Sequence, residues 1–206
     1  MRQIGPRNRI ARRVGLDLGL KTLGSKSQAC LLKRLNVVPG QHGTKKRRKV
    51  SERAVQLKEK QKLRFIFGLT ERQLKKYFKK ASIKKGNTAF YLSQFLEMRL
   101  DNLVYRLGLT PTRPAARQLV GHGHVVVDGK KVTIPSYQVR VGETIGFINE
   151  KIMKIPYIEK SISNKDIIIP SWLEKKATVG KLIAEPTDDE IAKQINLRLV
   201  IEYYSR

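Results

Sequence analysis

Arg113, Arg117 and Gln118 stand outside the apolar pattern of a short predicted helix, and Lys130 and Lys131 follow at the tip of a predicted hairpin. Guanidinium and ammonium groups donate several hydrogen bonds each and bind phosphate, the guanidinium in a bidentate manner. Together these side chains could form one cationic face. We therefore predict a phosphate-binding surface in which Arg113, Arg117 and Lys130 contact the ligand.

A second group of basic residues precedes this region. Lys and Arg recur among apolar residues over residues 51–80 in a helical pattern. A charged run on a helix is usually a solvated face, but in a chain this basic we favour phosphate contact, because each neutralised phosphate releases counterions. The contacts predicted from this part are Arg53, Lys58, Lys62, Arg64, Lys75 and Lys76.

The charge of the whole chain points to the class of partner. There are 43 Lys and Arg against 17 Asp and Glu, a formal net charge of +26, and residues 1–100 hold 27 of the basic and five of the acidic residues. Such an excess implies a polyanionic partner. No apolar run approaches the roughly 20 residues that span a bilayer, and the basic residues do not form one juxtamembrane cluster. The prediction is nucleic acid and no membrane.

The residues that bind metals or cofactors are sparse. Cys30 is the single cysteine, which excludes an intrachain disulfide and fits a reducing compartment. His122 and His124 lie two residues apart and His42 is distant, which is not the spacing of a zinc site. No Gly-rich loop has nucleotide-binding spacing, and no Ser, His and Asp set is suggested by a local motif. We expect no metal and no cofactor.

Two helices and a small set of strands should position the first cationic group. One helix is predicted from an N-cap at Ser93 to Gly108, because apolar residues recur there at three- and four-residue steps. Thr112 should cap a second helix that ends at Gly121 or Gly123. The residues of the apolar repeat are Leu96, Leu100, Leu103, Val104 and Leu107.

The strands follow directly. His124 to Val127 and Lys131 to Ile134 are rich in β-branched residues and are joined by Asp-Gly, which predicts a tight hairpin. Tyr137 to Val141 and Thr144 to Ile148 are predicted as further short strands. Beyond them, the mixture of Lys, Ser and Asn with scattered apolar residues over Ile152 to Asp166 is typical of a linker or loop.

The flanking segments have weaker patterns. Ser51 to Phe67 is predicted as a helix, and Thr70 with Gln73 is predicted to form a capping box for the next one. Ile167 to Ile169 is interpreted as a short strand, and Trp172 as a packing anchor. The Pro and acidic residues around Glu185 to Glu190 are typical of a helix start, where negative charge suits the helix dipole.

Several of these stretches resemble a known family. The sequence TRPAARQLVGHGHVVVDGKKV resembles the S-four-type RNA-binding module, in which a pair of helices and a hairpin present basic residues to structured RNA. The flanks VVPGQHG, VQLKEKQKLRFIFGLTERQLKKYF, RLDNLVYRLG, PSWL and VIEYYSR together resemble the small ribosomal subunit protein four family of bacterial or plastid type. The resemblance covers nearly the whole chain.

The resemblance implies an α+β fold. We expect a basic arm over residues 1–50 that orders on RNA, and a helical domain over 51–92 that residues 184–206 complete. Between them, residues 93–183 should form an inserted α+β module of two helices and a small antiparallel sheet, with its extension.

The resemblance also implies a function. The family binds the 5′ domain of small-subunit ribosomal RNA early in subunit assembly, and contacts small-subunit protein five in its role in decoding accuracy. Its basic stretch near the messenger RNA entry path matches Lys45, Lys46 and Arg48, although one extra residue after the preceding motif shifts the register. The implied location is the ribosome, in the cytoplasm, or in an organelle stroma if the chain is plastid-encoded.

Two other functions use the same module. A pseudouridine synthase would need a catalytic acid, and Asp101 is the candidate, but an ion pair of Asp101 with Arg99 or Arg106 fits the predicted helix better, and no segment is large enough for a catalytic domain. A stress protein that handles stalled ribosomal particles would lack the PGQHG and VIEYYSR flanks. We therefore favour a structural RNA-binding protein over an enzyme.

Overall fold

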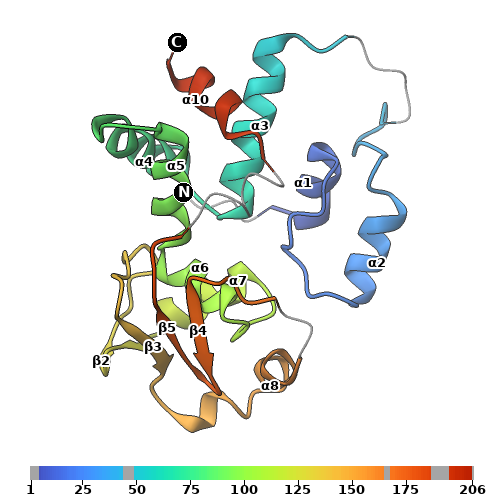
Figure 1. Ribbon diagram of the computed structural model, residues 1–206. Helices are drawn as coiled ribbons and strands as arrows, with labels where there is room; N and C mark the ends of the chain where they lie inside the picture. The colour runs from blue at the N-terminus through green and yellow to red at the C-terminus, as the bar shows by residue number, and fades with distance from the viewer. Residues whose placement is uncertain (1–4, 44–48, 165–167, 187–194, 206) are drawn as a thin grey trace. The chain divides into compact units, whose positions relative to one another are not determined.

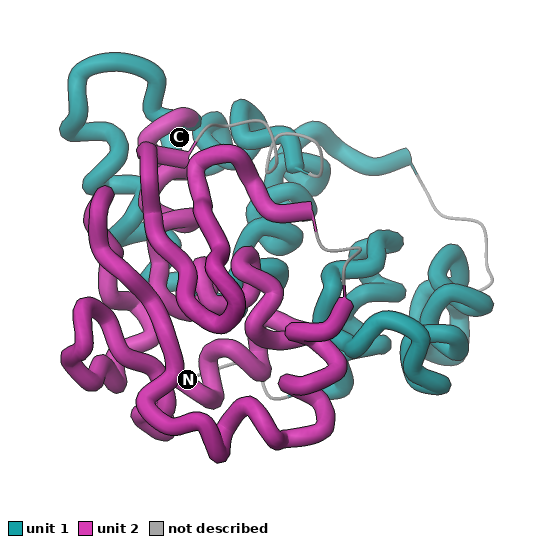
Figure 2. Tube along the Cα trace, turned by 60° about the horizontal axis from the view of Figure 1, so that its bottom comes forward, with its two compact units in different colours: residues 1–89, 189–206 teal, residues 90–188 magenta. Residues whose placement is uncertain are grey.

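The computed structural model describes residues 5–43, 49–164, 168–186 and 195–205. The chain forms two compact units, of which unit 1 comprises residues 1–89 and 189–206, and unit 2 comprises residues 90–188 (Figures 1 and 2). Within the described ranges, no helix has the length and apolar character needed to cross a membrane. Helices and a small antiparallel sheet are both present, so the predicted α+β class is confirmed.

Unit 1 is helical. Its elements are α1 (Arg7–Val14), α2 (Lys26–Lys33), α3 (Glu52–Ile66), α4 (Glu71–Ile83) and α10 (Leu197–Ser205). Apolar residues of α1, of α2 and of the connection between them are buried, namely Ile10, Ala11, Val14, Leu18, Leu20 and Leu31. The expectation that residues 1–50 order on RNA stays a prediction.

Capping residues set the starts of α3 and α4. The Ser51 hydroxyl accepts a hydrogen bond from the backbone N–H of Ala54, and the Thr70 hydroxyl accepts one from Gln73. The Gln73 side chain in turn accepts from the backbone N–H of Thr70, which completes the predicted capping box. Both helices therefore begin where their sequences indicate.

The C-terminal helix α10 packs against α3 and α4 within unit 1 (Figure 1). The rings of Phe78 and Tyr204 stack with their centroids 5.0 Å apart. Farther along the interface, Gln56 donates a hydrogen bond to Glu202, and the backbone N–H of Asn196 donates to Glu59. Two segments far apart in the sequence thus form one helical layer, joined by aromatic and polar contacts.

Unit 2 begins with helices and continues into a sheet. The helices are α5 (Thr88–Glu97, whose first two residues belong to unit 1), α6 (Leu100–Arg106), α7 (Arg113–Gly121) and α8 (Pro156–Ser163), with a short 3-10 helix η1 at Glu150–Ile152. The strands are β1 (Val125–Val127), β2 (Lys130–Lys131), β3 (Thr144–Phe147), β4 (Leu173–Lys176) and β5 (Val179–Leu182). Among the described residues they form one antiparallel sheet in the order β2-β1-β3-β5-β4.

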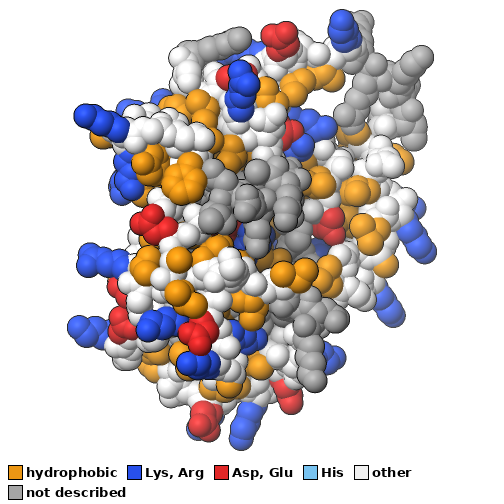
Figure 3. Space-filling model, in the orientation of Figure 1, with side chains coloured by type: hydrophobic (Ala, Val, Ile, Leu, Met, Phe, Trp, Pro, Cys, Tyr) orange, Lys and Arg blue, Asp and Glu red, His pale blue; other side chains and the backbone are white. Residues whose placement is uncertain are grey.

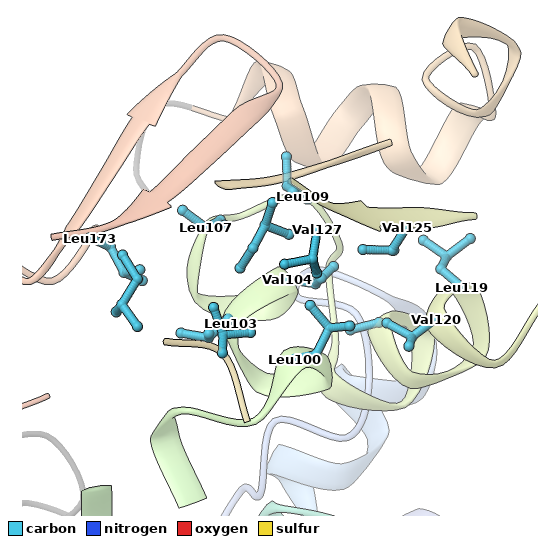
Figure 4. Close-up of a cluster of buried hydrophobic side chains, with 14 of the residues drawn as sticks. Leu100, Leu103, Val104, Leu107, Leu109, Leu119, Val120, Val125, Val127 and Leu173 are labelled. Carbon is cyan, nitrogen blue, oxygen red and sulfur yellow. The ribbon is translucent and has the colours of Figure 1, made fainter. Parts of the chain in front are cut away.

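The core of unit 2 lies between α6, α7 and one face of the sheet. Figure 4 shows Leu100, Leu103 and Val104 of α6 facing Val127 of β1. Trp172, just before β4, is 4% exposed and belongs to the same cluster, so its predicted role as a packing anchor is confirmed. This core fixes α6 and α7 on the sheet and so determines where their polar side chains lie.

The local signals around α7 and the hairpin turn are confirmed, but of the second strand predicted over Lys131 to Ile134 only Lys131 lies in β2. The Thr112 hydroxyl accepts a hydrogen bond from the N–H of Ala115, and α7 ends at Gly121. Asp128 and Gly129 both have positive φ, 45° and 75°, as a tight hairpin of this kind requires. The Asp128 carboxylate also accepts hydrogen bonds from the backbone and hydroxyl of Thr144, which lower its pKa and tie the turn to β3.

The helix predicted from Ser93 to Gly108 is wrong in its start. Ser93 lies inside α5 and is buried, and the apolar repeat runs through two helices that are interrupted at Arg99. The interruption arises because the backbone there pairs with a distant segment, the N–H of Val139 donating to Met98 and that of Leu100 to Tyr137. This pairing is a single bridge, so the strand predicted over 137–141 is also wrong.

Two later predictions also differ from the structure, and two strands were not predicted. The segment predicted as a linker over 152–166 contains the end of η1 and all of α8, which buries Ile158 and Ser161 on one face. Ile168 and Ile169 are not in a strand, while Ile167 lies outside the described residues. Strands β4 and β5 were missed because their sequences, LEKK and VGKL, are too polar for the β-branched pattern. Most of the helix predicted near 185–190 is outside the described residues.

Candidate nucleic-acid interface

Helix α4 presents one continuous basic face. Its exposed Arg72, Lys75, Lys76, Lys79 and Lys80 recur at three- and four-residue steps, while Leu74 and Ala81 are buried on the opposite side. Within the part of the chain that the structure describes, none of these five side chains forms an ion pair. Five solvated cations along about 12 Å of helix, at 1.5 Å per residue, suit a polyanion.

The four contacts predicted on α3 are not equivalent. Arg53 and Lys58 are exposed, and the structure gives them no carboxylate among the described residues. Lys62 forms an ion pair with Glu59, one turn before it, and Arg64 lies 3.9 Å from Glu71 and packs on the ring of Phe65. Lys62 and Arg64 are therefore partly neutralised, and they contribute less to an outward cationic field.

A polar cluster holds α4 in place against α10. The Lys60 ammonium, which is almost fully buried, lies 2.9 Å from Glu71 and 4.3 Å from the ring centre of Tyr203. The Tyr204 hydroxyl donates to Glu71 at 2.7 Å. Burial raises the pKa of the Glu71 carboxyl, but this hydrogen bond and the Lys60 charge outweigh burial and hold the pKa below its usual value. Burial and the same hydrogen bond raise the pKa of Tyr204.

In unit 2, Arg113 and Arg117 project from α7 toward α6. The Nε of Arg113 donates to the side-chain oxygen of Asn102 at 2.8 Å, and its guanidinium stacks 4.4 Å from the ring centre of Tyr105. Burial lowers the pKa of Arg113, and the nearby positive charge of Arg106 adds to this effect. Arg113 is thus a partly buried cation whose position is fixed by Asn102 and Tyr105, unlike the solvated lysines of α4.

Arg117 shares a carboxylate with a buried arginine. Arg99 donates to both oxygens of Asp101, at 3.0 and 2.7 Å, and a guanidinium nitrogen of Arg117 lies 3.7 Å from the same carboxylate. The ion pair predicted for Asp101 therefore forms with Arg99, and not with Arg106. Two arginines therefore lie around this one carboxylate.

Sequence reasoning missed the partner of Arg106. Glu97, at the end of α5, accepts from Arg106 Nη2 at 2.7 Å and Nε at 3.0 Å, and it also accepts from the side-chain amide of Asn102. Because Asn102 in turn accepts from Arg113, the two arginines are linked through one buried bridge. No sequence signal indicates this ion pair, because Glu97 and Arg106 lie nine residues apart on either side of a helix break and no helical spacing rule connects them.

The hairpin tip carries the remaining predicted contact of unit 2. Lys130 and Lys131 form β2 and are exposed. The aliphatic end of the Lys131 side chain lies over Gly123, where an added Cβ would collide with it. Lys131 is therefore directed back along the hairpin toward the end of α7, whereas Lys130 lies at the turn beside Gly129.

The predicted residues thus fall into separate groups. Arg53, Lys58, Lys75 and Lys76 are exposed in unit 1, and Arg113 and Arg117 are held by polar partners in unit 2. The candidates Lys45, Lys46 and Arg48 lie outside the described residues. Lys and Arg side chains spread over the visible surface instead of gathering in one spot (Figure 3). In the described ranges, no group of His, Cys, Asp and Glu could hold a metal ion.

Comparison with known proteins gives matches along the chain. Residues 2–97 match the family model described as ribosomal protein S4/S9 N-terminal domain, and residues 98–145 match the S4 domain. The boundary between the two matches, at residues 97 and 98, falls between Glu97 and the Arg99–Asp101 pair.

Curated relatives match over their full length. A protein named small ribosomal subunit protein uS4 from Aquifex aeolicus is 47% identical over 213 aligned positions, covering 100% of this chain and 99% of the relative. Proteins of the same name from Xanthomonas campestris pv. campestris and Xanthomonas oryzae pv. oryzae are each 45% identical with the same coverage.

Proposed function

Because this chain belongs to the family of small ribosomal subunit protein uS4, we propose that it is a structural constituent of the small ribosomal subunit and binds the 5′ domain of small-subunit ribosomal RNA. The observation that carries this proposal is the basic face of α4, whose lysines are exposed and form no ion pair among the described residues. A face of this kind neutralises backbone phosphates.

Recognition rests on shape as well as charge. In A-form RNA the base edges of the deep groove are out of reach of side chains, so proteins bind phosphates, 2′-hydroxyls and the geometry of junctions. The cations of α4 and those of α6 and α7 belong to two different compact units, and each unit fixes its own set on a rigid core. We infer that binding requires an RNA whose phosphates match both sets, which favours a folded domain over a single helix.

We base the more specific roles that follow on membership of this family. We propose that the chain nucleates small-subunit assembly, contributes to translational accuracy through contact with small-subunit protein five, and lies near the messenger RNA entry path. Lys45, Lys46 and Arg48 are the candidates for messenger RNA contact. The chain would act in the ribosome, in the cytoplasm or in an organelle stroma if it is plastid-encoded.

A structural role is also favoured over catalysis. Asp101, the carboxylate considered as a nucleophile, accepts two hydrogen bonds from Arg99, one at each of its oxygens. Side chains of the core surround the helix on which it lies. The relatives reported above are named as ribosomal proteins.

The test is a titration of the purified protein with the 5′ domain of small-subunit ribosomal RNA and with an unrelated folded RNA of equal length, at several salt concentrations. We expect a preference for the first RNA that persists as salt rises. Equal binding to both RNAs that collapses with salt would refute specific recognition, because it would leave only the general attraction of a basic chain.

A matched pair of variants tests the α4 face. Lys75→Ala/Lys76→Ala should reduce the slope of log affinity against log salt by about one unit for each lysine. Lys151→Ala/Lys154→Ala removes the same charge from exposed positions elsewhere and should change the slope less. Equal slopes for the two variants would show that α4 contributes only its charge.

A further inference from the structure

Tyr204, near the end of the C-terminal helix α10, contacts helix α4 at two points. Its hydroxyl donates to the Glu71 carboxylate at 2.7 Å, in the first turn of α4. Its ring stacks on that of Phe78, farther along the same helix, with the centroids 5.0 Å apart. One side chain of α10 therefore holds α4 at two positions about 10 Å apart along the helix, at 1.5 Å per residue.

The Glu71 carboxylate is the point at which α3, α4 and α10 meet. The buried Lys60 ammonium of α3 lies 2.9 Å from it, and a guanidinium nitrogen of Arg64, on the same helix, lies 3.9 Å from it. Burial and the hydrogen bond to Glu71 raise the pKa of Tyr204, so its hydroxyl remains a donor at neutral pH. Glu71 thus joins α4 to α3 directly and to α10 through Tyr204.

Helix α10 fixes α3 and α4 relative to each other within unit 1. It packs against both helices (Figure 1), and this packing is more extensive than that of α3 on α4. The angle between α3 and α4 therefore depends on contacts that α10 makes. Because Tyr204 holds α4 at two positions, it restrains a tilt of α4 as well as a shift.

Both helices carry cations that face solvent. Arg53 and Lys58 of α3 are exposed, and so are the five cations of the basic face of α4. A folded RNA presents its phosphates at fixed distances from one another, and proteins recognise this geometry. Cationic groups that already have fixed relative positions lose less conformational entropy on binding such a ligand. The angle between α3 and α4 is thus relevant to RNA affinity.

We propose that Tyr204 is a positioning residue, which holds the basic face of α4 at a fixed distance from the exposed cations of α3 so that both helices match the phosphates of one folded RNA. This inference rests on the proposed RNA binding. It gives the C-terminal helix a role in recognition that does not require Tyr204 to touch the RNA.

The decisive variants change Tyr204 and leave every charge of the chain in place. Tyr204→Leu removes both contacts with α4, so it should weaken binding to the 5′ domain RNA several-fold and reduce the salt slope by about one unit, as loss of one phosphate contact does. Tyr204→Phe keeps the stack on Phe78 and loses the donor to Glu71, so its affinity should lie between those of Tyr204→Leu and the wild-type protein. Full recovery in Tyr204→Phe, or none, would overturn the two-point contact.

A control separates positioning from loss of stability. Ser51→Ala removes the hydroxyl that caps α3, and so destabilises unit 1 without touching α4 or α10. The full-length proteins are compared at a temperature at which circular dichroism shows each of them to be folded. We expect Ser51→Ala to keep the wild-type salt slope. The same slope for Tyr204→Leu and Ser51→Ala would overturn the proposal. Tyr204→Phe, the more conservative change, keeps the proposal open to refutation if Tyr204→Leu does not fold.

A double-variant cycle tests whether Tyr204 acts through the lysines of α4. The partner variant replaces Lys75, Lys76, Lys79 and Lys80 with Ala. Once these side chains are absent, Tyr204→Leu has fewer phosphate contacts to misplace, so it should weaken RNA binding less than it does in the wild-type protein. Additive losses would show that Tyr204 acts independently of the basic face, and would overturn the proposal.

The outcomes distinguish this inference from the proposed function. If the wild-type protein prefers ribosomal RNA but Tyr204→Leu binds like Ser51→Ala, the positioning role is refuted and the function stands. If the wild-type protein binds both RNAs equally, the proposed function fails, and the salt slopes measured on either RNA still decide whether Tyr204 positions α4.

Discussion

Gly180→Ala should destabilise unit 2 although it adds only one methyl group. Gly180 lies on β5, on the face of the sheet that meets α6, opposite Ile145 of β3. A Cβ built on Gly180 would lie 2.3 and 2.4 Å from the two terminal methyl carbons of Leu107 and 2.8 Å from its Cγ. Since Leu107 is fully buried in the cluster of unit 2, its side chain has no open space into which to move.

The size of the expected destabilisation follows from this collision between the added methyl group and Leu107. Inserting a methylene or methyl group into a well-packed core typically costs about 1–3 kcal/mol. All three of these carbons belong to one side chain, so relief requires Leu107 to leave its rotamer or the end of α6 to shift away from β5. We therefore expect a loss of about 2 kcal/mol. Leu107 directly follows Arg106, so a shift there would also disturb the arginine that faces Glu97.

Trp172 supplies the assay. It is the only tryptophan of the chain, it is buried in the same cluster, and it therefore reports the unfolding of unit 2 specifically. Urea unfolding followed by tryptophan fluorescence gives the free energy of unfolding of this unit. A midpoint for Gly180→Ala equal to that of the wild-type protein would refute the reasoning.

A double-variant cycle identifies the cause. Leu107→Ala alone should cost about 2–5 kcal/mol, because it opens a cavity in the core. In Gly180→Ala/Leu107→Ala the added methyl enters that cavity, so the combined loss should be smaller than the sum of the two single losses. Strict additivity would show that the glycine is required for a reason other than its contact with Leu107.

Two further predictions concern caps and pH. Thr112→Ala removes the hydroxyl that accepts from Ala115 at the start of α7, and it should lower the free energy of unfolding of unit 2 by about 1 kcal/mol, again measured by tryptophan fluorescence, whereas Thr112→Ser should lose little. The pKa of Glu71 is depressed in the folded state, so its contribution to the stability of unit 1 is present above its ordinary value of 4.5 and is lost as the pH falls through the folded pKa. The hydrogen-exchange protection factors of α3 and α10 amides should therefore fall less steeply on acidification in Glu71→Gln than in the wild-type protein, and parallel pH profiles of these factors would contradict the role assigned to Glu71.

Where a structural feature depends only on residues close together in the sequence, the sequence alone was sufficient to predict it. The cap of α7 needs only Thr112 and the N–H three residues later, and the hairpin needs only Asp128 and Gly129, which accept positive φ. The capping box of α4 is local in the same way. The net charge of the chain and the spacing of the α4 lysines likewise require no tertiary contact, so the class of partner could be predicted.

Pairing between distant segments decided the rest. The apolar repeat through α5 and α6 fits one helix, and it is broken only because the backbone on either side of Arg99 hydrogen-bonds to residues 137–139. Strand β4 has a polar sequence, and its place in the sheet comes from pairing with β5 alone. Hydrogen-bonding partners so far apart in the sequence leave no periodic signal.

The same limit applies to the candidate site. The sequence alone determined that the chain is basic and that Arg113 and Arg117 stand outside an apolar helix face, and from the charge it predicted a polyanionic partner. Only the tertiary structure decided that Arg113 is held by Asn102 and linked to Arg106 through Glu97, because the end of α5 meets α6 and α7 only after the core has formed. Residue type indicates what a side chain can bind, whereas its fixed geometry comes from packing.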